Sequence, residues 1–160
     1  MSNEICASAS CDCGRLSIEV LSAPFLQLVC HCPDCRKVTG QPFTEIVFYA
    51  PRTYMVHGEC QPLTMKGGSG YNKTYSSCLE CGAPVYATVD VLGGAVGVIA
   101  NRLSPFRFTP VMHVWTSEKA TGTRLPTLAL KFSKGPPKIG ASVLRRYVKH
   151  LAKARDPKSA

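Results

Sequence analysis

The chain has 160 residues, of which 45% are hydrophobic and 18% are charged, so it has the length of one domain with a sizeable core and not the composition of a disordered protein. Its formal net charge is +9, but that charge is concentrated at one end. Residues 1–130 carry ten Lys or Arg and nine Asp or Glu, whereas residues 131–160 carry nine Lys or Arg and a single acidic residue. The basic character therefore belongs to the C-terminal segment, and the body of the protein is nearly neutral.

The hydropathy of the chain argues against secretion and against a membrane span. Residues 1–10 have neither a basic start nor an apolar run, so no secretory signal is expected. No apolar segment approaches the roughly 20 residues that a membrane span needs. We therefore expect a cytoplasmic protein that does not act at a membrane. In the cytosol thiols stay reduced, and the odd number of nine cysteines also argues against a full disulfide framework.

The predicted elements are mostly short strands between turns, in keeping with the 13 glycines and 12 prolines of the chain. Alternating apolar and polar residues, or short apolar runs bounded by turn residues, mark each of these strands. A glycine-rich loop is expected over residues 66–70, and Gly93-Gly94 predicts a hairpin. In chain order, the expected strands cover residues 16–20, 25–29, 44–49, 53–57, 72–77, 84–91, 95–99 and 111–115.

One helix is predicted, near the C-terminus. Between residues 141 and 154 apolar side chains recur at intervals of three and four, and basic side chains fill the remaining positions. A linker that contains Pro136-Pro137 is expected to join this helix to the body. The predicted fold class is therefore mostly β, with a zinc domain over residues 8–132 and a linker and basic C-terminal helix over residues 133–160.

Seven of the nine cysteines fall into three clusters whose spacing is typical of metal sites. Thiolates one or two residues apart can bind one zinc ion at about 2.3 Å per bond, whereas cysteines this close in sequence rarely reach the geometry of a good disulfide. Seven ligands divide into one closed site of four and one open site of three. The clusters read Cys11-Asp-Cys13-Gly14, Cys30-His31-Cys32-Pro33-Asp34-Cys35 and Cys78-Leu79-Glu80-Cys81-Gly82.

The first and last clusters predict a structural zinc site. Cys-x-x-Cys-Gly is a zinc-knuckle pattern, in which the glycine supplies a backbone conformation that needs no Cβ. A four-cysteine site needs two such pairs from distant parts of the chain. We therefore expect Cys11, Cys13, Cys78 and Cys81 to bind one zinc ion, with two pairs of buried, reduced cysteines as the alternative.

The middle cluster predicts a catalytic zinc site on Cys30, Cys32 and Cys35. Three protein ligands plus an open position are typical of catalytic zinc, and the open position can hold water or a substrate thiolate. His31 is expected to point away from the metal, as a structural hydrogen-bonding residue or as a proton relay. A fourth protein ligand would instead close the site and make the protein a zinc scaffold without catalysis. The candidates for that ligand are Cys6, His57, Cys60 and His113.

Together the three clusters resemble the glutathione-dependent formaldehyde-activating enzyme family, whose motifs run Cys-x-Cys-Gly, Cys-His-Cys-x-x-Cys-Arg and Cys-x-x-Cys-Gly. The resemblance covers roughly residues 8–132 and implies a mostly β, Mss4-like fold with two zinc ions per chain. The four-cysteine zinc is structural in this family and the three-cysteine zinc is taken to be catalytic. The chain departs from the family pattern at its only tryptophan, Trp115, which falls within the strand predicted over 111–115 instead of after it.

The resemblance implies a zinc-dependent carbon–sulfur lyase that joins the thiol of glutathione reversibly to formaldehyde, as S-hydroxymethylglutathione. Glutathione or a similar thiol, with formaldehyde or another small carbonyl, would then be the substrates. The thiol would occupy the open position of the three-cysteine zinc as a thiolate. Arg36 and Lys37 are candidates for binding the carboxylates of glutathione, with solvated surface charges as the alternative.

A second hypothesis is a nucleic-acid or chromatin-binding module that uses the basic C-terminal segment for phosphate contacts. A centromere-associated relative that shares the domain provides a precedent. We favour the alternative, in which the apolar face of the predicted helix packs on the body of the protein or on a second subunit of a homo-oligomer.

Overall fold

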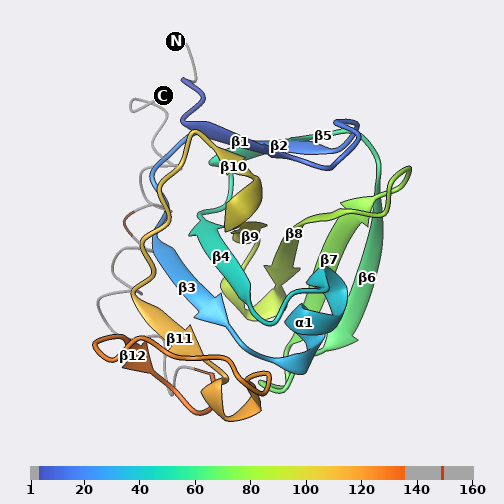
Figure 1. Ribbon diagram of the computed structural model, residues 1–160. Coiled ribbons are helices and arrows are strands. Elements are labelled where there is room, and N and C mark those ends of the chain that lie inside the picture. Colours follow the sequence, from blue (N-terminus) through green and yellow to red (C-terminus); the bar gives the residue numbers. More distant parts are fainter. Residues whose placement is uncertain (1–3, 136–148, 150–160) are drawn as a thin grey trace.

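The structure of the protein is a computed structural model that describes residues 4–135 and residue 149. Strands dominate these residues, which confirms the mostly β fold class (Figure 1). Apart from residue 149, the helix predicted over 141–154 lies outside the described residues, as does most of its linker. No helix in the described part of the chain is both long enough and apolar enough to cross a membrane.

The strands form two sheets, one of four strands and one of eight (Figure 1). The smaller sheet is antiparallel and has the order β10-β1-β2-β5. Its strands are β1 (Ala7–Ser10), β2 (Ser17–Val20), β5 (Tyr54–His57) and β10 (Leu103–Ser104).

The larger sheet has the order β12-β11-β3-β4-β9-β8-β7-β6. Strand β11 pairs in parallel with both β3 and β12, and the other pairs are antiparallel. Its strands are β3 (Leu26–Cys30), β4 (Thr44–Tyr49), β6 (Cys60–Lys66), β7 (Asn72–Cys78), β8 (Pro84–Val89), β9 (Val96–Ile99), β11 (Met112–Val114) and β12 (Leu130–Lys131).

Two hydrophobic clusters form the core, and each contains cysteines of one predicted metal-binding group. One cluster includes Cys11 and Cys78, and the other includes Cys30, Cys32 and Cys35. Strand β4 contributes to both, because alternate side chains of a strand point to opposite faces of the sheet. Val47 and Tyr49 belong to the first cluster and Phe48 to the second. Apolar packing therefore surrounds two cysteines of the first group and all three of the second.

A short helix that the sequence analysis missed follows directly on β3. Helix α1 (Pro33–Thr39) begins after Cys32, whose sulfur accepts a hydrogen bond of 3.4 Å from the Cys35 N–H as an N-cap. Pro33 is at the first helical position, where its missing N–H costs nothing. The sequence does not indicate this helix, because seven residues are too few to show helical periodicity. The helix places Cys35 in its first turn, on the buried side, close to the N-cap residue Cys32.

Several predicted boundaries also change. Strands β1, β6, β10 and β12 were not predicted. The strand predicted over 84–91 ends at Val89, where the 3₁₀ turn η1 (Asp90–Leu92) begins, although the pairing of β8 with β9 confirms the hairpin. The strand predicted over 111–115 ends at Val114, because Trp115 has a left-handed backbone with φ of 59°. Trp115 therefore follows the strand, which corrects its expected position.

The turn between β5 and β6 packs tightly against the chain that follows Cys13, and Gly58→Ala tests this contact. A Cβ at Gly58 would collide with the carbonyl oxygen of Arg15. Gly70→Ala is the matched control, because Gly70 also has a positive φ but has no atom within 4 Å of the added Cβ. We expect the control to lose about 1–2 kcal/mol for its left-handed backbone, and Gly58→Ala to lose a further ~1–3 kcal/mol from overpacking. Urea unfolding of the metal-loaded variants measures both, and equal losses would contradict the contact.

Candidate metal centres

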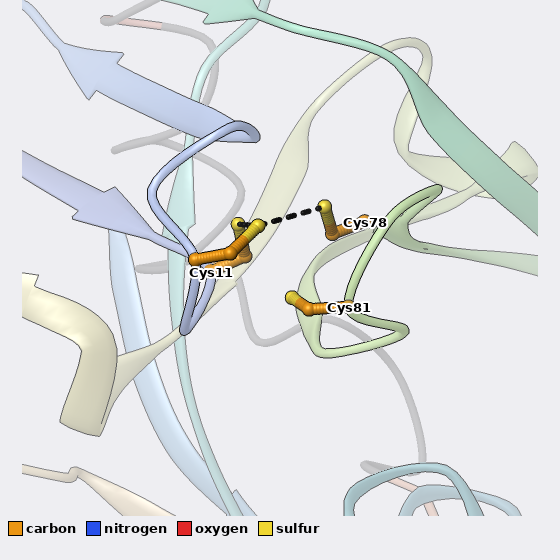
Figure 2. Close-up of side chains that lie close together, drawn as sticks. Cys11, Cys78 and Cys81 are labelled. Carbon is orange, nitrogen blue, oxygen red and sulfur yellow. Dashed lines mark hydrogen bonds between the residues drawn. The ribbon is translucent and has the colours of Figure 1, made fainter.

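The first candidate centre joins two turns that lie far apart in the sequence (Figure 2). Cys11 and Cys13 lie between β1 and β2, whereas Cys78 ends β7 and Cys81 precedes β8. Their four sulfur atoms all lie within 4.8 Å of one another. The Cys13 sulfur is 3.5 Å from that of Cys11 and 3.7 Å from that of Cys78. The structure thus brings together the four cysteines that the spacing assigned to one metal.

Both turns end in a glycine whose N–H bonds back to the first cysteine of the turn, three residues back in one turn and four in the other, which explains the repeated Cys-Gly pattern. The Gly14 N–H donates to the Cys11 carbonyl oxygen at 3.1 Å, and the Gly82 N–H donates to the Cys78 carbonyl oxygen at 2.9 Å. Both glycines have φ above 70°, in the left-handed region that a Cβ disfavours. In the first turn the Leu16 N–H also donates to the Cys11 sulfur at 3.2 Å. Each turn therefore directs its pair of sulfurs toward the other turn.

The second candidate centre lies where β3 runs into α1. Cys30 ends the strand, Cys32 caps the helix and Cys35 lies in its first turn. All three side chains are buried, with exposed fractions of 4–6%, and their sulfur atoms lie within 4.8 Å of one another. Among the described residues, no fourth histidine, cysteine or carboxylate joins this group. Three sulfurs in one buried cluster can hold one metal ion and leave a position for another ligand.

The four residues considered as a fourth ligand each have other contacts. Cys60 lies 3.7 Å from the Tyr86 hydroxyl oxygen, and the His57 Nε2 lies 3.1 Å from a Glu19 carboxylate oxygen. Cys6 is exposed. The remaining candidate, His113, pairs with His31.

His31 is buried between β3 and β11 and does not join the three cysteines. Its Nε2 lies 3.0 Å from Nδ1 of His113, and its backbone N–H donates to the Val114 carbonyl oxygen at 3.0 Å. Burial, followed by the neighbouring positive charges, lowers the pKa of His31 to about 4, so the ring is neutral at pH 7. The side chain hydrogen bonds across the parallel strand pair, and its Nδ1 is buried without a protein partner in the described structure.

Strand β7 contributes two residues to the three-cysteine centre that the sequence analysis did not select. Lys73 and Tyr75 are two positions apart and so share a face of the strand. The Lys73 ammonium lies 3.6 Å from the Cys32 sulfur and donates to an Asp34 carboxylate oxygen at 2.8 Å. The Tyr75 hydroxyl oxygen lies 3.2 Å from the Cys35 sulfur. Contacts between residues about 40 positions apart arise from the fold and leave no local signal in the sequence.

The protonation of these groups follows from burial and from their neighbours. Hydrogen bonds from Cys30 and Cys35, with the Lys73 charge, lower the pKa of Cys32 to about 2 despite its burial. Burial alone lowers the pKa of Lys73, but the Asp34 carboxylate and the cysteine sulfurs outweigh it and raise that pKa, so the ammonium stays charged. Burial also raises the pKa of Tyr75, which therefore remains a neutral phenol.

Arg36 and Lys37 occupy the outer side of α1. An Arg36 guanidinium N–H donates to the Glu118 carbonyl oxygen at 3.0 Å, so Arg36 is not simply a solvated surface charge. Lys37 is exposed. Both residues line a shallow hollow of about 460 Å³ that continues onto the loop after the helix. A second cavity of about 340 Å³ lies between that loop, the start of β8 and the turn η2 (Ala100–Arg102), and it has no cysteine in its wall.

A family model described as "Glutathione-dependent formaldehyde-activating enzyme" matches residues 6–118, a stretch that spans most of the chain and contains both cysteine centres. The chain belongs to the glutathione-dependent formaldehyde-activating enzyme family. Among solved structures, this family member is similar to the crystal structure of a Rhodobacter sphaeroides protein that was a structural genomics target. The two are 20% identical, the match covers 62% of this chain and 90% of that one, and the TM-score is 0.48. No curated protein matches.

Within this family member, Cys81→Ser tests the four-cysteine centre. Metal binding to such a centre supplies folding free energy, so we expect one metal ion fewer per chain and a loss of stability on the order of several kcal/mol. Cys60→Ser is the matched control, because Cys60 faces Cys78 across the strand pair without belonging to the centre. Elemental analysis and thermal unfolding measure both effects. A Cys81→Ser protein with unchanged metal content would contradict the centre.

Proposed function

We propose that the protein is a zinc-dependent carbon–sulfur lyase that acts on adducts of glutathione, or a similar thiol, with formaldehyde or another small carbonyl. Membership of the family supports formaldehyde-activating chemistry. The observation that carries the proposal is the buried group of three cysteines with no fourth metal-ligating side chain among the described residues. Such a group has a place for the sulfur of a substrate.

The donor atoms of both centres fit zinc. Each consists of cysteine sulfurs alone, which suit zinc and do not suit the oxygen-preferring ions magnesium and calcium. Four sulfurs complete a closed structural site, whereas three leave one position of a tetrahedron free. The sheets and the two cysteine groups also accord with the Mss4-like fold that the family resemblance implies. A zinc ion held by Cys30, Cys32 and Cys35 would supply one kind of chemistry, the deprotonation of a thiol near neutral pH.

The surroundings of the three cysteines favour addition of a thiol over hydrolysis. Three thiolate ligands donate strongly to a metal, which makes it a weak Lewis acid that is better suited to a thiol than to water. The low exposure of the three sulfurs keeps bulk water away from the bond that forms. In the addition, the thiolate sulfur bonds to the carbonyl carbon, the π electron pair moves to the oxygen, and that oxygen takes a proton from solvent. In the reverse direction the proton leaves, the carbonyl re-forms and the thiolate departs.

The outer surface of α1 provides a place for the charged parts of the thiol. Glutathione carries two carboxylates, and the hollow on the outer side of α1 is lined by Arg36 and Lys37. Arg36 has already committed one N–H to the backbone, so Lys37 is the freer of the two charges. We propose that this hollow holds one or both carboxylates while the sulfur occupies the three-cysteine centre. The partners of the protein are then a small thiol and a small carbonyl.

Cys32→Ser tests the catalytic centre without removing the helix that supports it. Serine is a favourable N-cap, so α1 and the fold are expected to persist, whereas one zinc ion per chain and all turnover are lost. Cys6→Ser, at an exposed cysteine outside both groups, is the control with full activity. Zinc content and the rate of S-hydroxymethylglutathione formation are the measurements. Retained turnover in Cys32→Ser would show that the catalytic assignment is wrong.

Lys37→Met tests the proposed carboxylate contact. A charge pair at an exposed site contributes about 0.2–1 kcal/mol of interaction free energy. Loss of the pair between Lys37 and a carboxylate of glutathione should therefore raise KM for glutathione roughly 1.5- to 5-fold and leave kcat unchanged. 2-Mercaptoethanol has no carboxylate, so its KM should stay the same in the variant. Steady-state kinetics with both thiols provides the comparison, and an equal effect on the two thiols would argue against a carboxylate at Lys37.

A further inference from the structure

We propose that Lys73 is a catalytic residue of this enzyme and that its ammonium stabilises the negative charge that develops on the carbonyl oxygen when the thiol adds. Asp34 is the positioning residue that holds the ammonium in place. The inference rests on the proposed function and adds to it a group that acts on the carbonyl, whereas the three cysteines act on the thiol.

The location of Lys73 is the first argument. It belongs to β7, and its ammonium reaches both Cys32 and the Asp34 carboxylate at the start of α1, at 3.6 and 2.8 Å (Figure 1 shows β7 and α1). Its side chain is only 15% exposed. Among the described residues, Lys73 is the cation that hydrogen bonds to a sulfur of the three-cysteine group. The positive charge therefore lies at the edge of the site and is largely shielded from water.

The lysine is also held from several sides, as a preorganised group must be. Asp34 binds its ammonium, which lies 5.8 Å from the centre of the Tyr75 ring. The glycine-rich loop rests directly on the side chain, because a Cβ at Gly67 would come within 2.7 Å of the lysine Cε. A side chain restrained in this way loses little freedom when charge appears beside it.

The hydrogen-bonding capacity of the ammonium is the third argument. An ammonium has three N–H donors, and Asp34 and Cys32 use two of them. No protein acceptor in the described part of the chain takes the third, which remains for a substrate atom. In the product of addition, the former carbonyl carbon is bonded to both the thiol sulfur and the former carbonyl oxygen. The oxygen is therefore two bonds away from the sulfur. A thiol sulfur placed among the three cysteines therefore brings the oxygen within range of the same ammonium.

Charge explains why such a donor is needed. Three cysteine thiolates and Asp34 carry four negative charges, and a divalent metal supplies two positive ones. A substrate thiolate adds one more negative charge, which passes from its sulfur to the carbonyl oxygen as the alkoxide develops. An alkoxide without a nearby cation would be strongly disfavoured in this buried setting. The ammonium keeps its charge throughout, and the proton that completes the hydroxyl comes from solvent.

The test compares Lys73→Met with Lys73→Arg, Asp34→Asn and the control Lys66→Met. Lys66 is an exposed lysine at the end of β6, and its substitution makes the same change in net charge. The assay is formation of S-hydroxymethylglutathione from glutathione and formaldehyde by the zinc-loaded full chain. Removal of one donor to an oxyanion typically lowers kcat by about 10²–10³-fold. We expect a loss in this range for Lys73→Met, a smaller loss for Lys73→Arg and for Asp34→Asn, and no change for Lys66→Met.

A second measurement separates action on the oxygen from support of the metal or the thiol. Zinc content is expected to remain at two ions per chain in Lys73→Met. The dissociation constant of glutathione alone, followed through the absorption spectrum of the cobalt-substituted protein, is expected to change less than about threefold, because no oxyanion forms without a carbonyl. Lys73→Gln, which keeps donors for Asp34 without the charge, replaces the methionine variant if that protein does not fold.

Full kcat in Lys73→Met would overturn the role of the lysine while leaving the proposed function intact. A fall in kcat matched by an equal weakening of zinc or glutathione binding would overturn it as well, because the lysine would then serve the metal or the thiol. A wild-type protein that binds two zinc ions and glutathione but shows no turnover would instead overturn the proposed function itself.

Discussion

Five of the seven grouped cysteines lie inside two apolar clusters, and a cation is needed to offset the negative charge of their thiolate forms. An uncompensated charge in such surroundings is costly, and several close thiolates also repel one another. Without a metal, the three-cysteine centre concentrates its charge on Cys32, whereas the pKa of Cys30 is raised well above its ordinary value by hydrogen bonding to its neighbours. The strands around both groups therefore hold the cysteines in positions where a bound cation would balance their negative charge.

The two centres differ in how they meet solvent. In the four-cysteine group Cys13 and Cys81 are exposed, whereas every member of the three-cysteine group is buried. The three-cysteine group, which leaves one coordination position for a further ligand, is thus the one in the drier environment. In such an environment a nearby ammonium or hydroxyl has a larger effect on a bound group than it has at the surface. Lys73 and Tyr75 occupy that environment, and no comparable cation contacts a sulfur of the four-cysteine group within the described residues.

The sequence predicts the grouping of the cysteines well because metal coordination, for which they were selected, imposes its own local spacing. Cys-x-Cys and Cys-x-x-Cys are short enough to be recognised without any knowledge of the fold, and both groups assemble as predicted. Helix α1 was missed because its seven residues show no apolar period, and β6 was missed because it is an edge strand with mostly exposed side chains. Lys73 could not be selected because it approaches Cys32 only after β7 has taken its place in the sheet.

Strand β4 lies between the two hydrophobic clusters, and this affects how the protein unfolds. Val47 and Tyr49 face the cluster that contains Cys11 and Cys78, while Phe48 faces the cluster that contains Cys30. A displacement of this strand disturbs the packing around both groups of sulfurs at once. Strand β7 is shared in the same way, with Cys78 in the first cluster and Tyr75 in the second. We therefore expect the two centres to unfold as one cooperative unit.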